Sequence, residues 1–341
     1  MKKLLFLPLL LVLALVACGG NDEVLEYSIL VPTDYYEIEE TEENEQVVEE
    51  IAEEIEGRPY IHGLLSYVEY GDNRAYIFGS MHLGRPYFFP LPARVEDAMH
   101  RSDIFAFEFD LTQLQDLAAM MEVARYMMLP LGTTLADVLP PETHAHLLDV
   151  LETFTLVNYE DIAMFQPMVA ATMITALEIF PLMDISEIYS VDTHIMSIAQ
   201  GLDRTIIGLN PLAHETSVLY RAPMDVQIAA INDLADRDTM IEAARDLGLV
   251  EAYTAQDIDA LFALLRPEDA HGNAFAQYMV DVILIQRSVE FAEEIHRLLV
   301  ETDEPTTFFV TMGIGHMIGD DHGNVFIVLE EMGYEVNSLW K

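Results

Sequence analysis

The chain has 341 residues, of which 52% are hydrophobic, so it is long enough to bury a substantial core. Its formal net charge is −43, with 59 acidic residues against 16 basic ones. Because no basic stripe is left to neutralise phosphates, the composition argues against binding to nucleic acid. We read the acidic surface as a sign of salty or alkaline surroundings, where hydrated carboxylates keep a protein soluble.

The first residues predict export and a lipid anchor. Lys2 and Lys3 precede the apolar run 4–17, which is shorter than the roughly 20 residues that span a bilayer. Cys18 and two glycines follow, as in bacterial lipoprotein signals. We therefore expect removal of a signal peptide 1–17 and acylation of Cys18, for example with palmitate, which would hold the protein outside the cytoplasm on the cell membrane. An ordinary cleaved signal followed by a chance cysteine is the alternative.

Cys18 is the only cysteine, so the mature domain can contain no disulfide, no cysteine-based zinc site and no thiol nucleophile. Residues 21–57 contain no Lys or Arg, and acidic residues crowd positions 37–56. Such a run repels itself and stays extended. We predict that 18–57 is a disordered tether between the lipid and a folded domain at 58–341.

From residue 58 onward the pattern is that of a compact α/β domain. Strands are predicted at 64–68, 74–78, 104–109, 205–209, 306–312, 325–329 and 334–338. Helices are predicted at 94–100, over most of 113–200, at 223–265 and at 273–300, with a loop at 266–272. Strands at both ends predict a single α/β domain whose central mixed sheet is built from both chain ends around a large helical middle section.

Two of the predicted strands run into the same short motif. Gly79-Ser80-Met81-His82 follows one strand, and Gly313-Ile314-Gly315-His316 follows another. In open α/β sheets, ligands gather at the carboxyl ends of strands, so these strands would present two imidazoles at one end of the sheet. Imidazole is the commonest metal-binding side chain and the usual acid or base near neutral pH. One such motif is typical of a structural turn, but two favour a shared site.

A third strand adds acidic residues. The strand at 104–109 runs through Phe107-Glu108-Phe109 into Asp110. A carboxylate in an apolar strand is costly unless it has a partner. Alternation places Glu108 and Asp110 on one face, opposite the two phenylalanines. An edge strand with a wet face is the alternative, but the strand ends at these acids, which favours a site.

These motifs resemble the TraB/GumN family, which is related to the Tiki proteins and more distantly to the erythromycin-esterase and ChaN-like group. The resemblance rests on the two Gly-x-x-His motifs, on 107–110 and on the closing Met317-Ile318-Gly319, and it covers 63–339. Shorter supporting stretches lie at 191–192, 199–201, 252–261 and 286–288.

The resemblance implies a metal-dependent site. His82 and His316 would ligate a divalent metal, and Glu108 would be a further ligand or a general base. Arg287 would anchor a substrate carboxylate or stabilise an oxyanion. Nitrogen and oxygen ligands suit Zn²⁺, Mn²⁺ or Co²⁺, which would polarise a carbonyl and activate water.

Two positions depart from the family's pattern. The family often has Leu-Glu where this chain reads Leu209-Asn210, and Arg-Asn where it reads Arg287-Ser288. Both positions lie outside the histidine motifs, so they concern substrate contacts and Arg287 more than the metal ligands.

The other histidines are weaker candidates. His194 follows Asp192 too closely for both to bind one ion, and His322 lies with Asp320 in a loop, where we expect them only as neighbours of the ligands. The histidines expected on solvated surfaces or helix caps are at positions 62, 100, 144, 146, 214, 271 and 296. No Gly-x-Ser-x-Gly, His-Glu-x-x-His or phosphate-binding loop occurs, so serine hydrolases, zincins and nucleotide enzymes lack support.

The sequence thus favours an extracytoplasmic metal-dependent hydrolase that resembles a metalloprotease and acts on a peptide or amide. Its expected partners are the membrane, through the lipid anchor, and a peptide or small-molecule substrate. Two alternatives stay open. A surface lipoprotein with the same histidines would capture haem or metal, since ChaN-like relatives are associated with haem. A regulator would sequester a signalling peptide without cutting it, as the pheromone-shutdown members of the family suggest.

Overall fold

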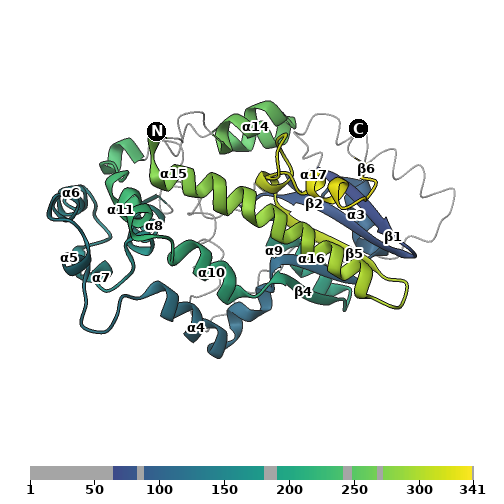
Figure 1. Cartoon of the computed structure of the whole chain (residues 1–341), viewed down its shortest axis with the longest axis horizontal. Helices are drawn as coiled ribbons and strands as arrows, with labels where there is room; N and C mark the ends of the chain where they lie inside the picture. Colours follow the sequence, from purple (N-terminus) through teal and green to yellow (C-terminus); the bar gives the residue numbers. More distant parts are fainter. Residues whose placement is uncertain (1–63, 83–87, 180–189, 241–247, 267–271, 340–341) are drawn as a thin grey trace.

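The computed structural model describes residues 64–82, 88–179, 190–240, 248–266 and 272–339 (Figure 1). The predicted signal peptide, Cys18 and the acidic tether therefore lie outside the described residues, as does most of the predicted loop at 266–272. Within the described ranges, every helix is too short or too polar to cross a membrane.

In the described part of the chain, a six-stranded mixed sheet has the strand order β4-β3-β5-β2-β1-β6. Its strands are β1 (Leu65–Tyr70), β2 (Asn73–Ser80), β3 (Ile104–Phe109), β4 (Thr205–Asn210), β5 (Thr307–Gly313) and β6 (Asn337–Ser338). Strands β2, β5, β3 and β4 run parallel, whereas β1 is antiparallel to both of its neighbours. The β1–β2 hairpin turns at Gly71, whose φ of 60° suits a glycine in a two-residue turn.

Helices form the middle of the chain; some pack on the sheet and others pack on one another in a second core. The α-helices are α3 (Ala93–Arg101), α4 (Leu117–Met127), α5 (Leu135–Val138), α6 (Pro141–Leu151), α7 (Tyr159–Ile162), α8 (Pro167–Ile179), α9 (Val191–Gly201), α10 (Leu212–Tyr220), α11 (Met224–Asn232), α13 (Leu249–Ala255), α14 (Ile258–Leu265), α15 (Ala274–Tyr278), α16 (Arg287–Glu301) and α17 (Val325–Glu331). Two 3-10 helices are η4 (Leu111–Gln115) and η9 (Ile314–His316). A π-helix, η8 (Met279–Gln286), joins α15 to α16. The predicted fold class is confirmed: the sheet takes strands from both ends, and helices lie between them.

The described residues form two buried hydrophobic clusters. One contains the sheet with α3, α9, α16 and α17, and the other joins α6, α8, α11 and α15. Figure 1 shows α5, α6 and α7 at the end of the molecule away from β1 and β6. Residues 105–109 of β3 are buried at five consecutive positions, so both faces of the sheet are covered.

The predicted strand at 325–329 is wrong, because these residues belong to helix α17. The Asn324 side chain accepts a hydrogen bond from the N–H of Phe326 at 3.0 Å and starts the helix. Buried residues at 325, 326, 328 and 329 recur at helical spacing. A short apolar run rich in valine does not distinguish strand from helix by its period. Of the predicted strand at 334–338, only β6 pairs, with residues 66 and 67 of β1.

Candidate functional site

The two Gly-x-x-His motifs follow adjacent parallel strands. β2 and β5 pair with Ser80 opposite Gly313, so both motifs begin at the same edge of the sheet. A Cβ atom at Gly79 would lie only 2.8 Å from Ile314 Cδ1. A glycine at this position therefore lets the two turns pack directly against each other.

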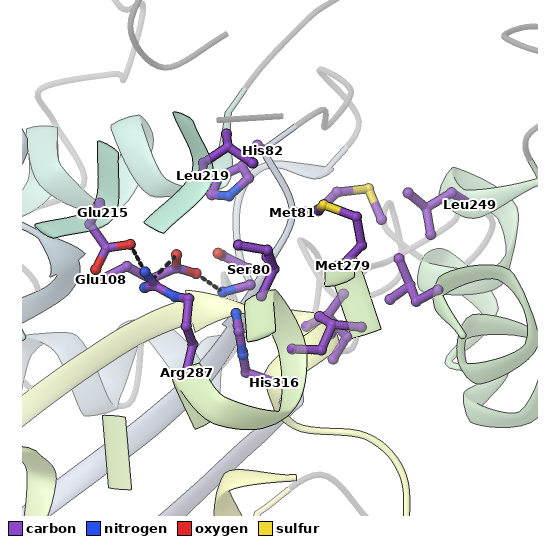
Figure 2. Close-up of a pocket in the computed structure, with 16 residues that line it drawn as sticks. Ser80, Met81, His82, Glu108, Glu215, Leu219, Leu249, Met279, Arg287 and His316 are labelled. Atoms are coloured by element: carbon purple, nitrogen blue, oxygen red, sulfur yellow. Dashed lines mark hydrogen bonds and ion pairs between the residues drawn. The ribbon is translucent and has the colours of Figure 1, made fainter. Parts of the chain in front are cut away.

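A pocket of about 80 Å³ opens at this edge of the sheet (Figure 2). The structure brings four of the predicted site residues into its lining: His82, Glu108, Arg287 and His316. The lining draws on both hydrophobic clusters, since Leu265 belongs to the first and Met279 to the second. The pocket thus lies where the two cores meet and where the parallel strands end, which are common places for ligand sites.

His82 is held in place by Asp192 at the start of α9. His82 Nδ1 lies 2.8 Å from Asp192 Oδ2, and Asp192 Oδ1 accepts a hydrogen bond from Ser80 Oγ at 2.8 Å. Burial alone would lower the pKa of His82, but the charge and hydrogen bond of Asp192 outweigh it and raise the pKa to about 9. Burial would likewise raise the pKa of Asp192, but His82 and Ser80 lower it. At neutral pH the imidazolium thus keeps a proton on Nε2, which must leave before that atom can bind a metal.

His316 is held differently, by a hydroxyl group. Its Nδ1 lies 2.9 Å from Ser288 Oγ, which also donates toward the carbonyl oxygens of Leu284, at 2.8 Å, and Gly323, at 2.9 Å. A hydroxyl has one proton, so when Ser288 gives it to a carbonyl it accepts from Nδ1–H. Burial lowers the pKa of His316 to about 4. The ring is therefore neutral near pH 7, and Nε2 carries the free lone pair.

Glu108 shares the pocket with both histidines. Its Oε1 accepts the backbone N–H of Gly313 at 2.7 Å, and the residue is 8% exposed. Its negative charge raises the pKa of both His82 and His316. Asp110, the second acid of this strand end, instead caps the 3-10 helix η4. Of these two acids, therefore, Glu108 lines the pocket and Asp110 does not.

Arg287 lies between two buried carboxylates. Its Nη1 forms an ion pair with Glu215 Oε2, and its Nη2 lies 3.9 Å from Glu108 Oε2. Arg287 is 3% exposed, yet Nη2 has no hydrogen-bond partner among the described residues. A buried N–H donor that faces a pocket without an acceptor is suited to bind a ligand oxygen.

Sequence reasoning missed Glu215. It lies on α10, and burial raises its pKa to about 7, although Arg287 opposes the rise. The pattern that could have revealed it is helical spacing: the buried side of α10 consists of positions 212, 215, 216, 219 and 220, and Glu215 is its only charged member. A charge on an apolar helix face needs a partner. The sequence pattern points to Asp192 only as part of a stretch that supports the family resemblance and as a poorly spaced neighbour of His194, so its contact with His82 was missed as well.

The weaker candidates lie outside the pocket lining. The ring of His194 packs 4.1 Å from that of Phe89, and burial lowers the pKa of His194 to about 4. The exposed His322 pairs with Glu331 at 3.0 Å, and Asp320 is exposed. The other described histidines divide into two exposed ones, at 100 and 296, and three half-buried ones, at 144, 146 and 214. Positions 62 and 271 lie outside the described residues.

The donor types of the pocket fit a divalent metal. Two imidazoles and two carboxylates, those of Glu108 and Glu215, line it, and each imidazole has its Nδ1 against an oxygen, as metal-binding histidines usually do. Within the described ranges, no three His, Cys, Asp or Glu side chains are gathered closely enough to hold an ion as they stand. The chemistry of the donors therefore suits a metal, but their spacing is not that of a preformed site.

Comparison with known proteins gives the family. A sequence model of the TraB/PrgY/gumN family matches residues 64–338. The chain belongs to the TraB/PrgY/gumN family. Among curated proteins, metalloprotease TIKI1 from Danio rerio is 22% identical over an alignment of 311 residues; the match covers 78% of this chain and 61% of that protein. The chain thus spans about three fifths of the length of this relative. No solved structure matches the chain.

Proposed function

We propose that this TraB/PrgY/gumN family protein is a metal-dependent hydrolase that cleaves a peptide or amide bond. The main support is one pocket, at the carboxyl ends of parallel strands, whose lining includes His82, Glu108, Arg287 and His316. The similarity to a protein named as a metalloprotease points in the same direction.

The two histidines would hold the metal through Nε2, with Glu108 beside them. When bound, a divalent metal supplies a Lewis acid that polarises a carbonyl and lowers the pKa of water. Glu108 Oε2, the oxygen not bonded to Gly313, takes the proton from water and passes it to the leaving nitrogen. Arg287 Nη2 donates to the carbonyl oxygen as negative charge develops there. Water thus adds to the carbonyl carbon, and the carbon–nitrogen bond breaks.

The size of the pocket gives less support to haem capture. The pocket holds about 80 Å³, whereas sites for drug-sized ligands usually hold about 300–1,000 Å³. A porphyrin would have to displace several lining side chains, so we place hydrolysis ahead of haem binding.

The test uses the full-length protein and two pocket variants, His82→Ala and His316→Ala. His322→Ala is the matched control, because this exposed ring pairs with Glu331 away from the pocket. Elemental analysis measures bound metal, and mass spectrometry follows the cleavage of a peptide library. We expect wild type and control to bind metal and cleave peptides, and both pocket variants to lose at least about 100-fold in rate.

Three other results would contradict the proposal. Full cleavage by both pocket variants would place the chemistry elsewhere. Tight peptide binding without cleavage would indicate a sequestering regulator. A Soret band on addition of haem, lost in both variants and without peptide cleavage, would indicate haem capture.

We also propose that the enzyme acts outside the cytoplasm, attached to the membrane by lipid on Cys18. The support is the sequence pattern of the first 20 residues. Cells fed labelled palmitate should label the wild-type protein and leave the Cys18→Ser variant unlabelled. Equal labelling of both proteins would contradict the anchor.

A further inference from the structure

The pocket has two chemically different ends. Its charged and titratable side chains gather at one end, and Figure 2 draws Met81, Leu249 and Met279 away from His82 and Glu108. Met81, Leu249 and Met279 form this apolar end, and Leu265, Ile283 and Leu284 are further apolar residues of the same pocket lining. A substrate that fills the whole pocket therefore meets a polar reaction centre and an apolar wall together.

One helical segment connects the two ends. Met279, Ile283 and Arg287 recur every four residues from η8 into α16, so they follow one side of this segment. Each step corresponds to about one helical turn, roughly 5 Å. If the carbonyl oxygen of a substrate amide binds Arg287, the substrate atoms next to that amide would therefore lie beside Ile283 and Met279. π-Helical turns are rare and are frequent at functional sites.

The apolar lining residues of the pocket, called the apolar wall below, are mostly buried and closely packed. Met81, Met279 and Leu284 are each at most 3% exposed. A Cβ atom at Gly315 would lie 3.0 Å from Leu284 Cδ2, so the glycine allows the second motif to approach this wall closely. Leu249 and Ile283 are half-buried. The wall is therefore shaped before a substrate arrives.

We propose that this apolar end is a subsite that selects an aliphatic or methionine side chain next to the amide that is cut. The proposal rests on the proposed hydrolase function. A charged side chain would lose its water here and find no partner on the wall. The flexible thioethers of Met81 and Met279 adapt to apolar chains of varied shape. A cavity of about 150 Å³ holds benzene, so the 80 Å³ of this pocket favours a few carbons over a large aromatic ring.

The test uses internally quenched peptides built from Gly, Ser and Ala, in which one central residue is Leu, Met, Trp, Asp or Lys. Cleavage rates and calorimetric binding are measured in parallel for the full-length protein. We expect kcat/KM for the Leu and Met peptides to exceed that for the Asp, Lys and Trp peptides by at least roughly tenfold. Leu249→Lys should reduce this preference and favour Asp. Leu117→Lys, at a position that is 76% exposed on α4 outside the pocket lining, should leave the preference unchanged.

The outcomes separate the two proposals. Equal cleavage of all five peptides would overturn the subsite and leave the hydrolase standing. Absence of cleavage with tighter calorimetric binding of the Leu and Met peptides would overturn the hydrolase and support the subsite. Absence of both cleavage and preferential binding would reject both. A preference that Leu249→Lys leaves unchanged would place the selection at another part of the protein.

Discussion

Asp192 Oδ2 lies 2.8 Å from His82 Nδ1, and this contact joins the start of helix α9 to the turn after strand β2. The same carboxylate accepts a hydrogen bond from Ser80, so its two oxygens fix both the first and the last side chain of the Ser80-Met81-His82 turn. A carboxylate on Nδ1 fixes the orientation of an imidazole and makes Nε2 more basic, which is the usual arrangement behind a metal-binding histidine.

Asp192→Asn tests this positioning role. The amide keeps the shape of the side chain and removes its charge, so we expect about a 10- to 100-fold loss of peptide cleavage and of metal affinity. Cleavage kinetics and elemental analysis measure the two effects. Asp233→Asn is the control, because Asp233 is half-buried and bonds to Asn273 outside the pocket lining.

A double variant separates positioning from an independent role. Residues that act as a unit show losses that do not add. Asp192→Asn combined with His82→Ala should therefore be no slower than His82→Ala alone. A further large loss in the double variant would show that Asp192 acts by some route other than His82.

Ser288→Ala should release the second histidine. Without Ser288 Oγ, the Nδ1 of His316 loses its partner at 2.9 Å, and the ring can change tautomer. We expect kcat to fall by about tenfold and the thermal midpoint to stay close to that of Ser197→Ala, a half-buried serine on α9. ¹⁵N NMR of the histidine rings should show the proton of His316 on Nδ1 in wild type and not in Ser288→Ala. An unchanged spectrum would contradict the assigned hydrogen bond.

The Arg287–Glu215 ion pair predicts an asymmetry in stability. Both residues are at most 3% exposed, so Arg287→Met leaves Glu215 buried without its partner, either as a charge or as a carboxyl that must take up a proton, at a cost of up to about 3–5 kcal/mol. Arg287→Met should therefore be strongly destabilised. The double variant Arg287→Met with Glu215→Leu should be more stable than this single variant, although it remains inactive. Urea unfolding measures the stability, and a double variant as unstable as Arg287→Met would contradict the pair.

The residues at the strand ends of this site can be predicted from the sequence, but the order of the strands in the sheet cannot. The repeated motifs and the acid in an apolar strand could be read from the residue pattern. That β5 lies between β2 and β3, and so brings Gly313 within 2.7 Å of Glu108, depends on the pairing of strands far apart in the chain. The sequence pattern holds no information on this register beyond which faces are apolar.

Residues supplied by helices were harder to find. Glu215 reaches the pocket from α10, and Asp192 contacts His82 from α9; each is recognisable only as a carboxylate at a buried helical position. The π-helix η8 gives no pattern of its own, because apolar residues at 279–286 satisfy an ordinary helix equally well. The short apolar run at 325–329 suits a strand or a helix equally well, and only the Asn324 cap distinguishes helix α17 from a strand.

His194 predicts how stability depends on pH, independently of catalysis. Burial lowers its folded-state pKa from 6.5 to about 4, so below about pH 6.5 the unfolded chain binds a proton that the folded protein does not. This contribution to stability is present above pH 6.5 and is lost as the pH falls toward 4, by at most roughly 3 kcal/mol. Urea unfolding at several pH values should therefore show a smaller loss on acidification for His194→Gln than for wild type. The exposed His322→Gln serves as control, and parallel curves for wild type and His194→Gln would contradict a half-buried, neutral ring against Phe89.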